Sequence, residues 1–565
     1  MKIIKISINL ILQILFVIIF FSTLNARNLE KYSSGGFVAD YFSGVLTLNN
    51  SQYEESYKYL KKLNGLEESH GSYSSKFLFS LINLGKFNEA FYFSKKLEKK
   101  ELNNFESDLI IGIYYLKNEK FDLAKKYFFK LRNAKSGFIL NDFLTNSLIN
   151  WVSFKETDFN NAQNKIDSID PSFENLKKIQ TVFVNCFYDK KDTELLYEKL
   201  TLNEKIDFSR YNYFYASYLL ENDKEKKAKK IINSSLDLYP KNLLLNQLQL
   251  DLKNDVFDNK FNCKNLSHVI AEIFYITANA LSSQRIYKYS NFYLNLSKFL
   301  NKKFISYDTL QAENLYNIND LSQAKKVYSK IAGQGEAFAW YSAKQKAKIL
   351  LEQNKQEQAI KLIKKSYDKL SYKNIYETLD FATFLKNNDQ FKDAIKFYTK
   401  ILKEIEKDHP LYPKVTDGRG VSYERVGEWD KAEKDLLSSL DASPDQAYVI
   451  NYLAYSWIEQ GIKIKQSLKM LEKANLLKSN DPYIVDSLGW ALFKLKRYKE
   501  SKVQLQSAVQ LLPEDPVIND HFGDALWKNG NEIQARYYWR YVLNLEDTED
   551  KLKKRIKKKL VSGLL

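Results

Sequence analysis

The residues of this sequence that could carry out acid–base chemistry lie close together near its C-terminal end. His521 stands beside Asp520 and three residues before Asp524, and a histidine flanked by carboxylates can act as a general acid or base. The chain has only four histidines, and the other three lie far from this position. We therefore interpret His521 as a residue at a packing surface with ordinary acidic neighbours.

Known catalytic and cofactor-binding motifs are missing from the sequence. It has no glycine-rich phosphate loop, no paired histidines at metal-ligand spacing, no nucleophile elbow and no Cys-x-x-Cys. We predict that the protein is not an enzyme, and that it uses no cofactor and no metal.

Cys186 and Cys263 are the two cysteines of the chain. In an oxidising compartment they could form a disulfide, which would stabilise the fold by roughly 4 kcal/mol in the chain-entropy model. Both lie in the least regular stretches of the sequence, so two free thiols are the alternative.

A repeating pair of small residues fills most of the chain. A small residue in one predicted helix is followed twelve positions later by another in the next helix, and most units begin 34 or 35 residues after the previous one. Two weaker pairs, Leu78 with Ala90 and Asn150 with Ala162, keep the spacing, and Ala454 with Ser467 has one extra residue. The full pairs are Gly44 and Ser56, Gly112 and Ala124, Ala216 and Ala228, Ala278 and Ser290, Ala312 and Ala324, Ala347 and Ala359, Ala382 and Ala394, Gly420 and Ala432, Gly489 and Ser501, and Gly523 and Ala535.

This spacing resembles the tetratricopeptide repeat, a helix–turn–helix unit of about 34 residues whose helices touch at small residues. The resemblance implies an all-α fold, a right-handed superhelical solenoid of about 13 to 14 such units in two segments. The composition agrees, because eight prolines and eighteen glycines in 565 residues leave few residues that break helices.

We place segment boundaries where the rhythm changes. Residues 36–254 form an N-terminal repeat segment in which 242–254 is a lone helix, 255–267 form a connector, and 268–545 form a C-terminal repeat segment. The division near residue 255 is predicted to be a hinge.

The two ends of the chain differ from the repeats. Residues 1–26 are typical of a secretory signal peptide, with basic residues before a mainly apolar run. We expect export, to the periplasm in a bacterium; an uncleaved segment that anchors the protein to the inner membrane is the alternative. Residues 546–565 are predicted to form a basic amphipathic helix that caps the solenoid, or that contacts an anionic membrane surface.

The resemblance also implies a binding surface. In such repeats the first helix of each unit lines the concave wall, so its exposed residues recur at fixed offsets from the first small residue. Carboxylates and amides there could bind a peptide backbone while rings pack its side chains; the alternative is that the rings fill seams between repeats and the acids cap helices. The candidate partner-binding residues are Asn451, Tyr455, Asp486, Trp490, Asp520, Asp524 and Trp527.

The formal charge of +17 could indicate a nucleic-acid or membrane partner. The lysines are spread along the chain without a nucleic-acid-binding motif. We attribute the charge to solvated helix faces and predict no nucleic-acid partner.

Three stretches near the C-terminus, residues 451–457, 483–492 and 516–527, resemble a group of exported alphaproteobacterial tetratricopeptide-repeat proteins that has no assigned reaction. The resemblance implies a non-catalytic scaffold. Our first hypothesis is a cell-envelope scaffold that binds a protein or peptide. The alternatives are a membrane-surface protein acting through its basic C-terminal helix and a subunit of an enzyme that acts on the cell wall. The sequence leaves the oligomeric state open.

Overall fold

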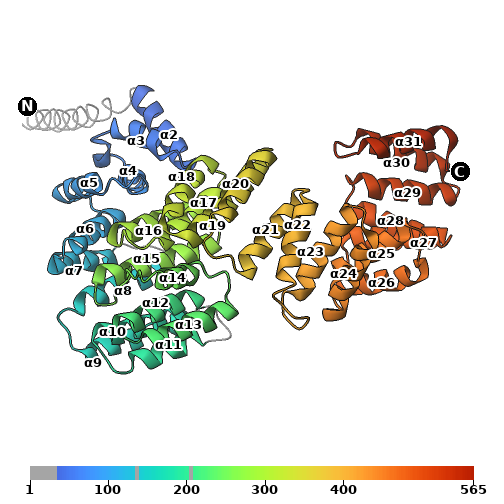
Figure 1. Cartoon of the computed structure of the whole chain (residues 1–565). Coiled ribbons are helices and arrows are strands. Elements are labelled where there is room, and N and C mark those ends of the chain that lie inside the picture. The colour runs from blue at the N-terminus through green and yellow to red at the C-terminus, as the bar shows by residue number, and fades with distance from the viewer. Residues whose placement is uncertain (1–34, 134–138, 203–207, 565) are drawn as a thin grey trace, which may run out of the picture. The chain divides into compact units, whose positions relative to one another are not determined.

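The computed structural model describes residues 35–133, 139–202 and 208–564. This part of the chain is all-α, with thirty helices, α2 to α31, and no strand (Figure 1). Thirteen pairs of successive helices form repeats within one or the other of two compact units, α19 and α20 lie on either side of the division between these units, and α14 and α31 stand outside the pairs. The all-α solenoid and the number of units agree with the prediction. The predicted signal peptide, 1–26, lies outside the described residues.

The chain divides into two compact units, unit 1 up to Lys355 and unit 2 from Gln356. The helices of unit 1 are α2 Gly35–Asn49, α3 Tyr53–Lys61, α4 Gly71–Asn83, α5 Phe87–Lys99, α6 Phe105–Lys117, α7 Phe121–Lys130, α8 Ile139–Ser153, α9 Phe159–Asp167, α10 Glu174–Phe187, α11 Thr193–Thr201, α12 Ser209–Glu221, α13 Glu225–Leu238, α14 Leu243–Lys253, α15 Leu266–Ser283, α16 Tyr287–Leu300, α17 Ser306–Asn317, α18 Leu321–Ile331 and α19 Glu336–Glu352. The helices of unit 2 are α20 Gln356–Asp368, α21 Ile375–Asn387, α22 Phe391–Ile401, α23 Tyr412–Arg425, α24 Trp429–Ala442, α25 Ala447–Glu459, α26 Ile464–Leu477, α27 Pro482–Lys494, α28 Tyr498–Leu511, α29 Pro516–Lys528, α30 Glu532–Asn544 and α31 Asp550–Ser562.

The small residues allow the two helices of one repeat to approach closely. At Gly489 an added Cβ atom would lie 2.6 Å from Leu505, and at Gly523 it would lie 2.5 Å from the ring of Trp539. Each contact joins a first-helix glycine to the residue sixteen positions later. A larger residue at the glycine would therefore push the paired helices apart.

Serine at the second small position adds a hydrogen bond between the helices. Ser501 Oγ donates to the carbonyl of Gly489 at 2.8 Å, and Ser290 Oγ donates to that of Ala278 at 2.7 Å. These hydroxyls are buried, so the carbonyl supplies the partner that burial requires.

The predicted hinge region lies inside unit 1. The lone helix predicted at 242–254 is α14, and the predicted connector at 255–267 follows it. Gln247 on α14 accepts a hydrogen bond from the backbone of Ala337 at the start of α19 (3.0 Å). The division between the compact units falls at Lys355, in the turn between α19 and α20.

Cys186 and Cys263 form a disulfide, with 6.0 Å between their Cα atoms. The bond fastens the end of α10 to the connector in front of α15. The pair therefore staples the two stretches of unit 1 whose repeat pattern is weakest.

Unit 1 folds back on itself. α15 packs against α6 and α8, and α16 packs against α4 and α6, so later helices cover the inner side of earlier repeats (Figure 1). The rings of Phe79 and Phe292 stack at 5.2 Å, and those of Phe87 and Phe299 at 4.1 Å. One continuous hydrophobic core extends from Leu60 to Leu310 as a result.

Unit 2 has a row of small cores instead. One joins α24 to α25, the next joins α25, α26 and α27, and the last runs from α27 to α31. Leu552 and Ile556 of α31 lie in this last core, as expected for a capping helix. Among the described residues, no helix is both long and apolar enough to cross a membrane.

Candidate interaction surface

The first helices of unit 2 carry a row of polar residues at one offset, three positions before the first small residue. The row is Asp417 on α23, Asn451 on α25, Asp486 on α27 and Asp520 on α29. Because each residue holds the same place in its helix, the row follows the stacking of the repeats.

Asp486 is bonded to the next first helix. Both of its carboxylate oxygens lie 3.0 Å from Nδ1 of His521, and the two side chains are almost completely buried. The ring of Trp490 stacks on His521 with centroids 3.9 Å apart, and its Nε1 donates to Glu459 at 2.7 Å. His521 is thus a packed, hydrogen-bonded part of the seam between α27 and α29.

Asp520 and Asp524 are bonded to the C-terminal helix. Arg555 donates to Asp520 at 2.6 Å, and Lys559 Nζ lies 2.5 Å from Asp520 and 2.6 Å from Asp524. Asp524 also accepts from Nε1 of Trp539 at 3.1 Å. Asp520 is 0% exposed and Lys559 8%, so α31 contributes basic side chains as well as apolar ones to its contact with α29.

Burial and crowding of charge shift the pKa values of this cluster. Burial raises the pKa of Asp524 to about 6, aided by the charge of Asp520 and opposed by Lys559. For His521, burial lowers the pKa but the carboxylates of Asp486, Asp520 and Asp524 outweigh it, so the pKa lies above its usual value. The cluster therefore favours a cationic His521.

The aromatic candidates fill seams. Trp490 is 7% exposed, and Tyr455 is half-buried with its ring 6.4 Å from that of His521. Trp527 packs 5.4 Å from Trp539 and lies directly under Gly563, the residue after α31. These rings hold repeats together, as the alternative interpretation proposed.

The structure corrects the expectation that the carboxylates are exposed on the concave wall. Asp486, Asp520 and Asp524 are buried and bonded to side chains two helices further along the chain, on α29 and α31. The physical reason is that first helices stack directly on one another, so acids at this offset meet the next helix before they meet solvent. The spacing of 35 residues from Asp486 to His521, and again from Asp520 to Arg555, is the sequence signal for these bonds.

At the other end of the row, Asn451 and Asp417 make no such bonds to residues that the structure describes. Asn451 is half-buried, and its Oδ1 is enclosed without a hydrogen-bond partner in the described part of the chain. Asp417, one repeat earlier, is half-buried, and burial raises its pKa against the influence of Lys386. Asp417 was not among the predicted residues, although its offset from Gly420 places it in the row.

A sequence relative identifies the repeat. The chain is 28% identical over 192 residues to a TPR repeat-containing protein, PA4667, of Pseudomonas aeruginosa. In the present chain, the paired helices meet at the small residues that define this repeat. The helix pairs of this chain are therefore repeats of the tetratricopeptide type. The match covers 34% of this chain and 31% of PA4667, so it bears on the repeat and not on the activity of the whole relative.

Other comparisons are weaker. The tetratricopeptide repeats align with MamA from Desulfovibrio magneticus (16% identity, 31% of this chain and 97% of that one, TM-score 0.27) and with TTC0263, a TPR protein of Thermus thermophilus (15%, 33% and 100%, TM-score 0.29). No family model matches the chain. The described residues hold no group of three or more His, Cys, Asp or Glu side chains suited to a metal ion.

Proposed function

We propose that this protein is a non-catalytic interaction scaffold of the bacterial cell envelope, and that the first-helix row of unit 2 binds a basic segment of a partner protein. The observation that carries the proposal is the contact between α31 and α29. There, two basic side chains of an amphipathic helix bind the acidic row: Arg555 donates a hydrogen bond to Asp520, and Lys559 donates one to Asp524.

The same row has places for another basic segment. Asp417 and Asn451 stand at the offset of Asp520, but they lack the bonds that Asp520 makes with α31. A partner that presents a lysine or arginine to Asp417 and packs beside Asn451 would complete the row in the way that α31 does.

The test is site-specific photocrosslinking in intact cells. A photoreactive residue replaces Asn451 on the candidate surface, and a control replaces Leu476, which is 86% exposed on α26. We expect one discrete adduct at position 451, lost when Asp417→Lys is added, and none at 476. An adduct that persists unchanged with Asp417→Lys would contradict the proposed site.

Export is supported by the signal-like residues 1–26 and by the disulfide, because such bonds persist mainly in oxidising compartments. Thiol labelling of protein denatured directly from cells tests this. Labelling of both cysteines without a reductant would argue against export.

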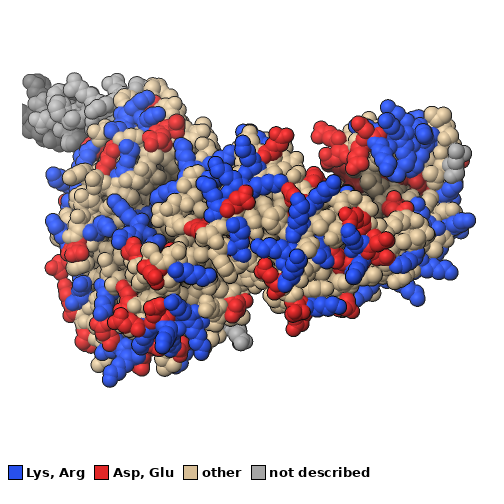
Figure 2. Space-filling model, in the orientation of Figure 1, with Lys and Arg blue, Asp and Glu red and all other residues tan. Residues whose placement is uncertain are grey.

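A second candidate function, contact with an anionic membrane, is favoured by the outer face of α31. Lys and Arg side chains gather over this helix in Figure 2, and Lys551, Lys554, Lys557 and Lys558 are exposed there. Leu552 and Ile556 of α31 are in the core and Leu560 packs against it, so attraction would be mainly electrostatic, about 1 kcal/mol per lysine near the membrane surface. Vesicles containing anionic lipid should bind the protein, and replacing these four lysines with glutamine should abolish binding.

A further inference from the structure

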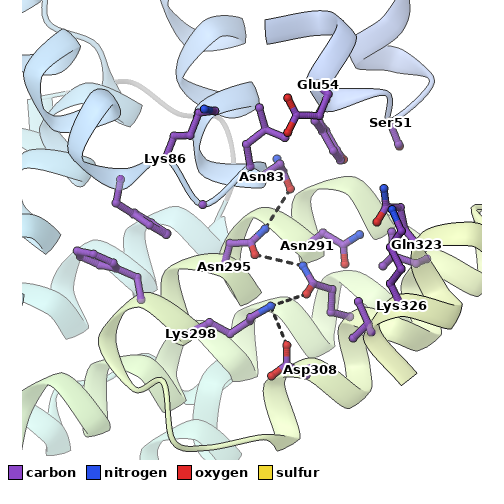
Figure 3. A pocket seen from close by; sticks show the side chains of 18 of the residues that line it. Ser51, Glu54, Asn83, Lys86, Asn291, Asn295, Lys298, Asp308, Gln323 and Lys326 are labelled. Atoms are coloured by element: carbon purple, nitrogen blue, oxygen red, sulfur yellow. Dashed lines mark hydrogen bonds and ion pairs between the residues drawn. The ribbon is translucent and has the colours of Figure 1, made fainter. Parts of the chain in front are cut away.

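Unit 1 contains a cavity of about 1260 Å³ between two groups of helices that are far apart in the sequence. One wall is formed by the N-terminal ends of α3 and α5, and the other by α16, α17 and α18. Figure 3 shows the gap between these walls, with Glu54 on the first and Lys298 and Lys326 on the second. The cavity arises from the fold-back of unit 1 and is distinct from the first-helix row of unit 2.

The floor of the cavity is a connected chain of amides. Asn295 donates to Asn83 at 3.3 Å and accepts from Gln311 at 3.2 Å, and Gln311 accepts from Lys298 at 2.7 Å (Figure 3). Asn295 and Gln311 are buried, so their bonds hold them in fixed positions. The floor thus offers preorganised amide groups to a ligand.

Some charged side chains of the lining already interact with neighbouring groups of the protein. Asp308 forms ion pairs with Lys298 at 2.7 Å and with Lys330 at 3.0 Å. The carboxylate of Asp320 accepts from the backbone of Gln323 and caps α18. Lys86 lies over the ring of Tyr57, 4.7 Å from its centre.

Other charges remain available on opposite walls. Glu54 and Glu55, in the first turn of α3, form no ion pair with any described residue, and the same holds for Lys302 after α16 and Lys326 on α18. An acidic wall therefore faces a basic wall across a floor of amides. A neutral ligand would leave both sets of charges unmatched, whereas a ligand with both signs of charge would complement them.

We propose that this cavity binds a zwitterionic, amide-bearing ligand, a short peptide with a cationic group toward Glu54 and Glu55 and an anionic group toward Lys302 and Lys326. The peptide amides meet the Asn295 and Gln311 floor. The cavity is larger than the roughly 300–1,000 Å³ of typical small-molecule sites, which fits an oligopeptide better than a single amino acid.

The test is calorimetric titration of the whole protein with blocked hexapeptides. One probe carries two lysines at one end and two aspartates at the other; the comparison probes carry only lysines or only aspartates at these places. We expect the mixed-charge peptide to bind at least about tenfold more tightly than either comparison probe, with an affinity that falls as salt rises.

Charge reversal tests the location of the site. Glu54→Lys with Glu55→Lys should abolish binding of the mixed-charge peptide, and so should Lys302→Glu with Lys326→Glu. The four changes together should restore binding, with the peptide lying in the opposite direction across the cavity. The matched control, Lys226→Glu with Lys230→Glu on the exposed face of α13, should change nothing. Absence of binding by the mixed-charge peptide, insensitivity to the reversals, or preferential binding of an N-acetylglucosamine tetramer would overturn the proposal.

Discussion

Units 1 and 2 are built from the same repeat but bury it differently. In unit 1 the fold-back places α15 and α16 against α4, α6 and α8, and one core extends through most of the unit. In unit 2 each repeat shares a small core with its neighbours only. Contacts between neighbours allow a repeat array to open stepwise, whereas contacts between distant repeats couple the whole unit. We therefore expect unit 1 to unfold cooperatively and unit 2 to fray.

The largest expected effect comes from a buried ion pair of unit 1. Arg210 on α12 holds Glu272 on α15 through two hydrogen bonds of 2.7 and 2.8 Å, and the Glu272 side chain is fully buried. Glu272→Gln leaves the arginine without its counter-charge and should cost about 3–5 kcal/mol. In denaturant titrations followed by hydrogen exchange, all of unit 1 should lose protection together.

The matched control for this variant is Glu225→Gln on α13, which removes one side of an exposed pair with Lys229 and should have no measurable effect. Loss of protection limited to α12 and α15 in Glu272→Gln would disprove the coupling within unit 1.

The disulfide should have a slightly smaller effect. Replacing Cys186 and Cys263 with serine removes a bond that closes 77 residues of sequence, and such bonds contribute about 2–4 kcal/mol. Unit 1 should melt at a lower temperature in the double variant or with a reductant. Unit 2 has no cysteine and serves as the internal control; an equal shift in both units would contradict their independence.

A local effect is expected at the end of unit 2. Asp520→Ala removes the partner of Arg555 and one of the two partners of Lys559, a loss of about 2–3 kcal/mol for charged hydrogen bonds. Hydrogen exchange should increase in α29 to α31 and stay unchanged in α20 to α25. A uniform increase over unit 2 would mean that its repeats are coupled as strongly as those of unit 1.

The sequence predicted the repeat well because the contact between paired helices is local. The offset from Gly489 to Ser501 and Leu505 lies within one unit, and the structure places these residues in contact. The N-cap of α27 is also predictable from the sequence, because an aspartate before a proline is a common helix start. In the structure Asp481 accepts hydrogen bonds from the backbone of Tyr483 and Ile484.

Contacts between repeats were harder to predict. The fold-back of α16 depends on the accumulated rotation of many repeats. Phe292 to Ser297 are all buried, so α16 is enclosed around its whole circumference, but its sequence includes Asn295 and Ser297 and does not read as a helix that is apolar on every side. The exposure of Asp486 and Asp520 was predicted wrongly, because their partners His521 and Lys559 belong to later helices. The offset of three residues before the first small residue identified the row correctly. Whether a side chain of this row is exposed depends on the helix that packs against it.

The smallest expected effect is a pH dependence that differs in sign between the units. In unit 1, burial of Glu67 is outweighed by its bonds to Lys96 and neighbouring groups, which lower its pKa to about 2; its stabilisation is present above the ordinary pKa and is lost as pH falls toward 2. In unit 2, the pKa values of Asp524 and His521 are raised, so the folded state binds protons more readily than the unfolded one. Stability of α29 to α31 should therefore fall as pH rises, first from about 4 to 6 through Asp524 and then above about 6.5 through His521.

Hydrogen exchange of α29 to α31 at pH 5 and pH 8, corrected for the intrinsic exchange rate, measures this pH dependence. His521→Gln should remove the upper part of the change, and Asp524→Asn should remove the lower part. Greater protection of α29 to α31 at pH 8 than at pH 5 would show that the acidic cluster does not control this end of the array.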